Sequence, residues 1–340
     1  MAIGFLKNRT ISHLRNNLLL DTQSENSSSV ASLTEPDELL LGQECFNELG
    51  VFPISYSWPG PVRVGEGAKR RALAPIIPGQ PYSFFDYQAY LRCYRQSKFA
   101  ITFKKGGWDC FRHLEILFSG SIPLMLDVSL IPEYTMIHYP KALMVGALQD
   151  SRNAQPASGV LSEELRKWCS QHLTSESMSN YFLALTGADT RSVLFVDRRL
   201  PNQCDYLSVM TLIGLKQLLG SSVKVQFPVS YVYDNAVGDF SSMNGRGFGY
   251  TRILSSEQMT TSERLSKENN EIDISAEGLL QYSTIVVGDM DANMDFITKI
   301  ESLDLDATLI YMRGGDLAPT RSEYREIRKF KGFVFSREIY

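Results

Sequence analysis

The sequence predicts an α/β fold made of two Rossmann-like domains that face each other. Short apolar runs alternate with segments of helical periodicity in both halves of the chain, and this alternation is typical of parallel sheets covered by helices. With 340 residues, 44% of them hydrophobic, the chain is long enough for two cores. We expect a first domain over residues 1–150, a helical bridge over 151–190 and a second domain over 191–340.

The first half is expected to be irregular at its start and regular after about residue 80. Residues 22–37 are polar and rich in serine, which favours a loop after an N-terminal helical stretch. Repeated prolines and glycines in residues 52–79 exclude long regular elements and leave an extended connector with one short strand. The segments that follow predict, in order, the helix YSFFDYQAYLRCYRQ, the strand FAITF, the helix FRHLEILF and the strand SIPLML.

The second half predicts a small parallel sheet. It opens with one β-α-β unit, made of SVLFVDRR, YLSVMTLIGLKQLLG and VKVQFPV. Three more strands are expected at STIVVGD, ATLIYMR and GFVFSRE. Ligands of such sheets bind at the carboxyl ends of the strands, so we expect the active site in a cleft between the two halves.

Composition excludes several classes of protein. The net charge of -4 gives no overall basic field, which argues against nucleic acid as a partner. No apolar run reaches the roughly 18 residues of a membrane span, and charges interrupt the start of the chain where a secretory signal would be apolar. The five cysteines form no CxxC pair, which argues against zinc and disulfides. We therefore expect a cytoplasmic chain with no transmembrane segment, metal or cofactor.

The segment from residue 97 to 127 carries the most chemical information. Its predicted strand leads into Gly106 and Gly107 and then into a short helix, whose free N–H groups can bind an anion. Asp109 is in position to cap that helix. Arg112 and Glu115 are three residues apart, so they share one helix face, which we expect to look towards the strand ends.

Taken singly, these residues have simple structural explanations: a helix salt bridge for Arg112 and Glu115, and a tight turn for the two glycines. Taken together, they predict that the cations bind a diphosphate and that the carboxylate accepts a hydrogen bond from a ribose hydroxyl. Trp108 could stack on a sugar ring or pack in the core. The candidate donor site consists of Lys104, Lys105, Gly106, Gly107, Trp108, Asp109, Arg112 and Glu115.

The same segment resembles the donor-binding half of exostosin-like glycosyltransferases, particularly their bacterial and viral members. The resemblance covers roughly residues 50–145 and rests on five short stretches, which are Ser97–Phe99, Lys104–Cys110, Arg112 to Glu115, Gly120–Pro123 and Pro132–Met136. It implies a GT-B enzyme, without an obligatory metal or a cofactor, in which the Arg and the Glu hold a nucleoside-diphosphate sugar.

The implied activity is an inverting hexosyl- or pentosyltransferase that acts on a glycan or glycolipid hydroxyl. In this chain the donor-like half comes first, which leaves open a swapped domain order or a place within a longer multidomain enzyme. A non-catalytic nucleotide-sugar-binding or scaffolding subunit remains the alternative. A nicotinamide-dependent oxidoreductase is disfavoured, because no predicted strand leads into GxGxxG with an acidic residue about 20 positions later.

No residue identifies itself as the catalytic base that an inverting transferase needs. His113, Asp197 and Asp205 are weak candidates, since the first follows Arg112 and the other two lie at or beyond a predicted strand end. Each has a simple alternative role in packing, capping or a loop. The glycine-rich stretch at residues 245–252 does not stand between a strand and a helix, which favours a flexible loop over the cleft.

Overall fold

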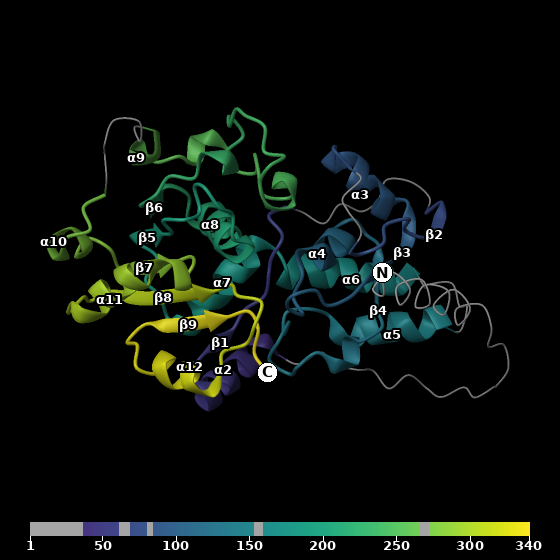
Figure 1. Ribbon diagram of the computed structural model, residues 1–340, viewed down its shortest axis with the longest axis horizontal. Helices are drawn as coiled ribbons and strands as arrows, with labels where there is room; N and C mark the ends of the chain where they lie inside the picture. Colours follow the sequence, from purple (N-terminus) through teal and green to yellow (C-terminus); the bar gives the residue numbers. More distant parts are fainter. Residues whose placement is uncertain (1–36, 61–68, 80–83, 153–158, 265–271) are drawn as a thin grey trace, which may run out of the picture.

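The computed structural model describes residues 37–340, except 61–68, 80–83, 153–158 and 265–271. It contains one sheet of six strands and one of three, and every pairing between strands is parallel (Figure 1). This confirms the expected α/β class with parallel sheets, an arrangement compatible with Rossmann-like folds. The helical stretch and serine-rich loop expected in residues 1–36 lie outside the described residues.

The larger sheet has the strand order β1-β9-β8-β7-β5-β6. Its strands are Phe52–Pro53 (β1), Val193–Val196 (β5), Val223–Val225 (β6), Thr284–Val287 (β7), Thr308–Arg313 (β8) and Phe333–Ser336 (β9). Residues of β5 and β7 are buried throughout, as expected for central strands covered on both faces. The order reverses at β5, which creates a topological switch point between β5 and β7.

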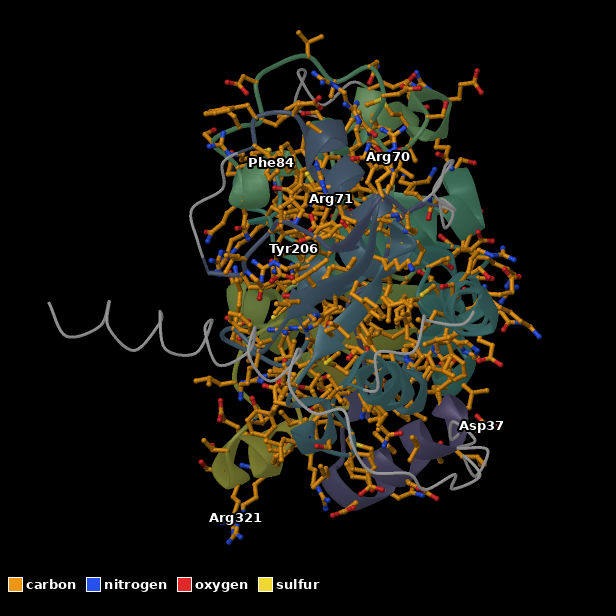
Figure 2. All side chains as sticks on the ribbon, turned by 90° about the vertical axis from the view of Figure 1, so that its right-hand side faces the viewer. Asp37, Arg70, Arg71, Phe84, Tyr206 and Arg321 are labelled. Carbon is orange, nitrogen blue, oxygen red and sulfur yellow. The ribbon has the colours of Figure 1, made fainter. Side chains whose placement is uncertain are left out.

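The smaller sheet has the order β2-β3-β4, with strands Arg71–Leu73, Ser97–Thr102 and Ile122–Met125. Figure 2 views the molecule from the side of this sheet and labels Arg71 at the start of β2. Helix α4, Phe111–Phe118, connects β3 to β4, and α3, Tyr87–Arg95, precedes β3. The expected helix–strand–helix–strand order is therefore confirmed within the described residues, although the first helix begins at Tyr87 and residues 82 and 83 lie outside the described ranges.

Helices surround both sheets. The remaining α-helices are α2 (Glu38–Leu49), α5 (Lys141–Arg152), α6 (Gly159–His172), α7 (Ser175–Thr186), α8 (Tyr206–Leu219), α9 (Thr261–Arg264), α10 (Ala276–Leu279), α11 (Met294–Ser302) and α12 (Arg321–Ile327). Helices α7 and α8 pack so closely that a Cβ on Gly214 would overlap the carbonyl oxygen of Ser175. None of the helices in the described ranges is long and apolar enough to cross a membrane.

The N-terminal part of the described chain pairs with the larger sheet. Strand β1 pairs with β9, with Phe52 opposite Phe335. Helix α2 is held against the end of α12, because Arg328 donates to the carbonyl oxygens of Glu48 and Leu49. The single short strand expected in residues 52–79 is therefore two strands, β1 and β2, which lie in different sheets.

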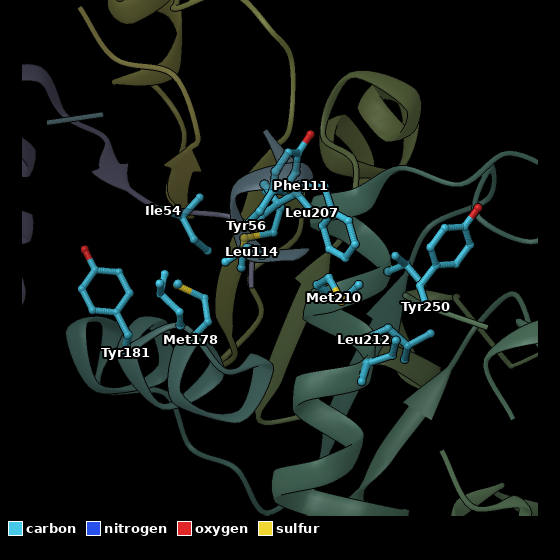
Figure 3. Close-up of a cluster of buried hydrophobic side chains, with 14 of the residues drawn as sticks. Ile54, Tyr56, Phe111, Leu114, Met178, Tyr181, Leu207, Met210, Leu212 and Tyr250 are labelled. Carbon is cyan, nitrogen blue, oxygen red and sulfur yellow. The ribbon is translucent and has the colours of Figure 1, made fainter. Parts of the chain in front are cut away.

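One cluster of buried hydrophobic side chains extends through both halves. It includes Leu114 on α4, Phe195 on β5 and Phe335 on β9. Figure 3 shows part of this cluster, where Tyr56 and Phe111 lie beside Leu207 of α8. The two sheets thus share core side chains, and this shared packing fixes the segment after β3 against the second half of the chain.

Candidate functional site

The loop between β3 and α4 contacts the chain segments that follow β8 and β9. A Cβ on Gly106 would overlap the Asp316 carboxylate, and a Cβ on Gly107 would overlap the Glu338 carboxylate. Neither glycine has a positive φ, so both are required by close approach and not by a left-handed turn. The Gly-Gly pair therefore lets the C-terminal segment pack against the loop.

Asp109 does not cap helix α4, so that prediction is wrong. The helix begins at Phe111, and its N-cap residue is Cys110, whose side chain makes no capping hydrogen bond. The Asp109 carboxylate instead accepts the Tyr56 N–H at 2.6 Å and the Tyr139 hydroxyl at 2.8 Å. Burial raises the Asp109 pKa to about 6, although Arg337 and these hydrogen bonds oppose the shift. Asp109 fixes the loop from within the core.

Arg337 is the centre of a polar cluster that we call the Arg337 junction; its buried members are Tyr56, Asp109, Arg337 and Glu338, and its exposed member is Asp316. Its guanidinium is fully buried and donates to the Asp109 carbonyl oxygen at 2.5 Å and to Asp316 at 2.5 Å. Glu338 Oε1 accepts from Arg337 at 2.9 Å and from the Asp109 N–H at 3.0 Å. Nε and Nη2 donate to the carbonyl oxygens of two glycines after β8, at 3.1 Å each. All three guanidinium nitrogens have partners.

The Arg337 junction also changes the expected anion site. A free backbone N–H before the helix was expected to meet a phosphate, but the Asp109 N–H already donates to a carboxylate of the same chain. Sequence reasoning missed Asp316, Arg337 and Glu338. The available signal was the charged pair directly after the apolar run of β9, at the carboxyl end where ligands of parallel sheets bind.

Arg112 and Glu115 form a second charged region on α4, which we call the Arg112–Glu115 face. Glu115 is buried, and its Oε2 accepts the Tyr90 hydroxyl at 2.7 Å. Burial raises the Glu115 pKa to about 7, against the opposing effects of the Tyr90 hydrogen bond and the charges of Arg112 and Lys105. Glu115 therefore faces α3, and the prediction that it looks out at the strand ends is wrong.

Arg112 differs from Arg337 in having an unused guanidinium nitrogen. Its Nη1 is buried and has no hydrogen-bond partner within the described residues. No ion pair joins it to Glu115 in that part of the chain, so a plain helix salt bridge does not account for the pair. Burial, followed by the positive charge of Arg112, lowers the pKa of the nearby Lys105. Two cations therefore share this face.

Lys104 and Trp108 contact each other at the edge of the loop. The Lys104 ammonium lies 4.8 Å from the centroid of the Trp108 ring and 5.2 Å from that of Tyr340. Trp108 is itself buried, with 9% of its surface exposed. Most of the Trp108 side chain therefore packs in the core, and its ring also contacts Lys104.

Of the three weak candidates for a catalytic base, the structure explains two by hydrogen bonding alone. His113 is fully buried, with Nδ1 2.8 Å from the Thr102 hydroxyl and Nε2 donating to the Trp108 carbonyl oxygen at 2.9 Å. Burial lowers its pKa to about 4, so the ring is neutral. Asp197 is also buried, and it accepts the Arg199 N–H at 3.0 Å and the Ser208 hydroxyl at 2.5 Å. Neither side chain has a nitrogen or oxygen left for a substrate proton.

Asp205 is the candidate that keeps an unused oxygen. It caps helix α8 by accepting the Ser208 N–H at 2.8 Å through Oδ1, and its Oδ2 has no hydrogen-bond partner in the described ranges. Burial raises its pKa to about 6, helped by the negative charges of Asp289 and Asp197. The next residue, Tyr206, stacks on Phe111 with ring centroids 4.6 Å apart. Asp205 therefore stands where the first turn of α8 meets the first turn of α4.

A cavity of about 510 Å³ lies between α3, the end of α4 and residues 238–253. The sequence predicts a flexible loop over the cleft at residues 245–252, and several of these residues line this cavity. The cavity contains none of the residues of the predicted donor site.

No group of three or more metal-binding side chains occurs in the described part of the chain. Comparison with known proteins gives no match: no family model, no curated protein and no solved structure is significantly similar to this chain. The resemblance to exostosin-like glycosyltransferases therefore rests on the short stretches of residues quoted above.

Proposed function

We propose that this chain is a glycosyltransferase that moves a monosaccharide from a nucleoside-diphosphate sugar to a hydroxyl of a glycan. The Arg112–Glu115 face would hold the donor. We further propose that the two sheets belong to two facing Rossmann-like domains of the GT-B type, with the donor half first in the chain. The transfer would be inverting and independent of metal.

The observation that carries this proposal is the unpartnered, buried Nη1 of Arg112. A buried donor left without a partner costs about 1–3 kcal/mol, so a structure that keeps one gains stability when a ligand supplies an acceptor. Phosphate oxygens suit a guanidinium particularly well, because the two groups can form parallel charged hydrogen bonds. Lys105 adds a second positive charge beside it.

Glu115 suits the sugar part of a nucleotide. Its Oε2 is held by Tyr90, while its Oε1 has no partner among the described residues. A carboxylate fixed in this way can accept a hydroxyl of the ribose ring. The Glu115 pKa is about 7, so this carboxyl group titrates near neutral pH. A nucleotide sugar bound beside it would therefore act on the protonation of Glu115.

Asp205 is the side chain best suited to act as the base. Its Oδ2 would take the proton of the acceptor hydroxyl as that oxygen forms a bond to the anomeric carbon. The bond from the anomeric carbon to the diphosphate breaks at the same time, and the diphosphate leaves with the electron pair. Arg112 and Lys105 would stabilise the charge that develops on it. A pKa of about 6 leaves Asp205 ionised at neutral pH and ready to accept a proton.

One observation favours the non-catalytic alternative, in which the chain binds a nucleotide sugar or acts as a scaffold. The loop N–H that would be expected to meet a phosphate is already occupied by Glu338. A chain with a filled loop site could still bind a donor through Arg112 and lack turnover.

The test is calorimetric binding of nucleoside diphosphates and their sugar conjugates, with Arg112→Ala beside Arg321→Ala as the matched control. Arg321 is exposed on α12, which lies away from α4 in Figure 1, and Figure 2 shows its side chain extending outward from the molecule. We expect one diphosphate series to bind to the wild type and the control, and Arg112→Ala to lose that binding. Product formation with an added glycan acceptor then separates a transferase from a binding subunit. A folded wild-type chain that binds no member of the panel contradicts the proposal.

A further inference from the structure

The cavity beside α3 is a second candidate binding site, separate from the Arg112–Glu115 face. One wall is formed by α3, a second by Trp58 and the end of α4 at Ser119, and a third by residues 238–253. We call it the 238–253 groove. Its volume of about 510 Å³ falls within the range of about 300–1,000 Å³ typical of small-molecule sites.

Aromatic rings line much of this groove. Phe248 stacks on Tyr87 with ring centroids 4.7 Å apart, and Phe85 remains 83% exposed at the groove edge. The indole of Trp58 packs against Phe118 with its ring centroid 5.4 Å away, so it presents a fixed ring to the cavity. Flat apolar faces of this kind suit the C–H faces of a sugar ring.

The charged residues that line the groove are mainly positive. They are Arg95, Asp239, Arg246 and Arg252, three cations against one anion. The Asp239 carboxylate is turned to its own loop, where it accepts the N–H and the hydroxyl of Ser241 at 2.9 Å each. The groove therefore favours a ligand with a negative charge.

Arg246 is the cation most available to such a ligand. Its guanidinium carbon lies 4.7 Å from the centroid of the Phe85 ring, and no hydrogen bond or ion pair of its side chain occurs in the described part of the chain. Arg252, by contrast, donates to the carbonyl oxygens of Ala236 and Gly238 at 3.1 and 3.2 Å. Arg252 is thus anchored to the loop by hydrogen bonds, whereas Arg246 is held by the Phe85 ring and by the charge of Asp239.

The backbone around Arg246 has a left-handed conformation that places its side chain at the groove edge. Arg246 has a φ of 61°, between Gly245 and Gly247 with φ of 56° and 71°. A left-handed conformation costs a non-glycine residue roughly 1–2 kcal/mol, and such conformations cluster at functional sites. A Cβ on Gly245 would also overlap the Tyr206 hydroxyl. This three-residue turn therefore directs the Arg246 side chain to the edge of the groove.

We propose that the 238–253 groove binds a phosphorylated sugar, with its ring against the aromatic wall and its phosphate on Arg246. Arginine fits phosphate geometry, and the aromatic wall supplies contact area that phosphate alone would not use. This inference goes beyond the proposed transferase and does not depend on it.

The test is titration calorimetry of the full chain with glucose 6-phosphate, beside glucose and inorganic phosphate as its separate parts. We expect glucose 6-phosphate to bind at least about tenfold more tightly than either part. Arg246→Asn should weaken that binding about tenfold or more, since a charged hydrogen bond is lost. Asparagine tolerates the left-handed backbone, so this variant removes the cation and keeps the turn. Phe85→Ala, at an exposed position, should also weaken binding of the sugar phosphate, because it removes part of the aromatic wall and the ring that holds Arg246.

Two further ligands test whether the groove prefers a different anionic group or a different ring. Glucuronate carries a carboxylate on a sugar, and uridine 5′-monophosphate carries a phosphate next to a base. Tighter binding of either one, equal binding of inorganic phosphate, or unchanged binding in Arg246→Asn overturns the proposal. Arg112→Ala should leave glucose 6-phosphate binding intact, so failure at the groove and failure at the donor site are distinguishable.

Discussion

The Arg337 junction and the Arg112–Glu115 face place two arginines close to the same loop in opposite states. All three guanidinium nitrogens of Arg337 donate to oxygens of the chain. Arg112 keeps a buried Nη1 without a partner in the described part of the molecule. A buried charge that is fully paired holds structure together, whereas an unpaired one is free to bind a ligand. The first region therefore stabilises the fold, whereas we propose the second as a binding site.

The largest expected difference is in stability. Arg337→Met should lower the free energy of unfolding by about 3–5 kcal/mol, because it leaves buried carboxylates without their cation. Arg112→Met, the same change on the other side of the comparison, should stay within about 1 kcal/mol of the wild type. Urea denaturation measures both. Equal losses in the two variants would remove the distinction between the regions.

The pH dependence of stability should depend on Glu115. Burial raises its folded-state pKa to about 7 from its ordinary value of 4.5, so between these pH values the folded state holds a proton that the unfolded state releases. Stability from this group is full below about pH 4.5 and is lost as pH rises to about 7. The loss amounts to about 3 kcal/mol. Glu115→Gln should show a smaller decrease over this range in denaturant titrations at stepped pH, and an unchanged decrease would mean that Glu115 ionises normally.

Binding should respond in the opposite order to stability. Arg112→Met should weaken nucleoside-diphosphate affinity at least about tenfold, the loss expected for a charged hydrogen bond of roughly 1.5–3 kcal/mol. A milder variant of the junction, Asp316→Asn, keeps an acceptor for Arg337 and should leave that affinity nearly unchanged. Calorimetry on both proteins checks this. A junction variant that loses affinity as strongly as Arg112→Met would make the junction part of the site.

The smallest expected effect separates the two glycines of the loop. Gly107→Ala should destabilise the fold by about 1–3 kcal/mol, because its Cβ meets the buried Glu338. Gly106→Ala should cost less, since Asp316 has 63% of its side chain exposed and can move away. Thermal unfolding of both variants gives the order. A reversed order would show that the Arg337 junction is looser than its hydrogen bonds indicate.

The alternating pattern predicted most strands and helices correctly, because each is formed by residues close together in the sequence. Strand β1 was not placed, since two residues carry no periodicity and its partner Phe335 is remote in the chain. The same limit affected the site. Asp109 has the sequence context of a helix cap, but its actual partners Tyr56 and Tyr139 lie 53 and 30 residues away. Arg112 and Glu115 were found from local spacing, whereas Arg337 and Glu338 act only through contacts made by folding.

The pairing of β1 with β9 has a consequence for how the chain is made. Phe52 leaves the ribosome early, but Phe335 must be synthesised before the edge of the larger sheet can close. At 5–20 residues per second, the delay is roughly 15–60 s. During that interval β1 has no partner strand, whereas β2, β3 and β4 can already pair with one another. If the chain folds during synthesis, we therefore expect the smaller sheet to be complete before the larger one.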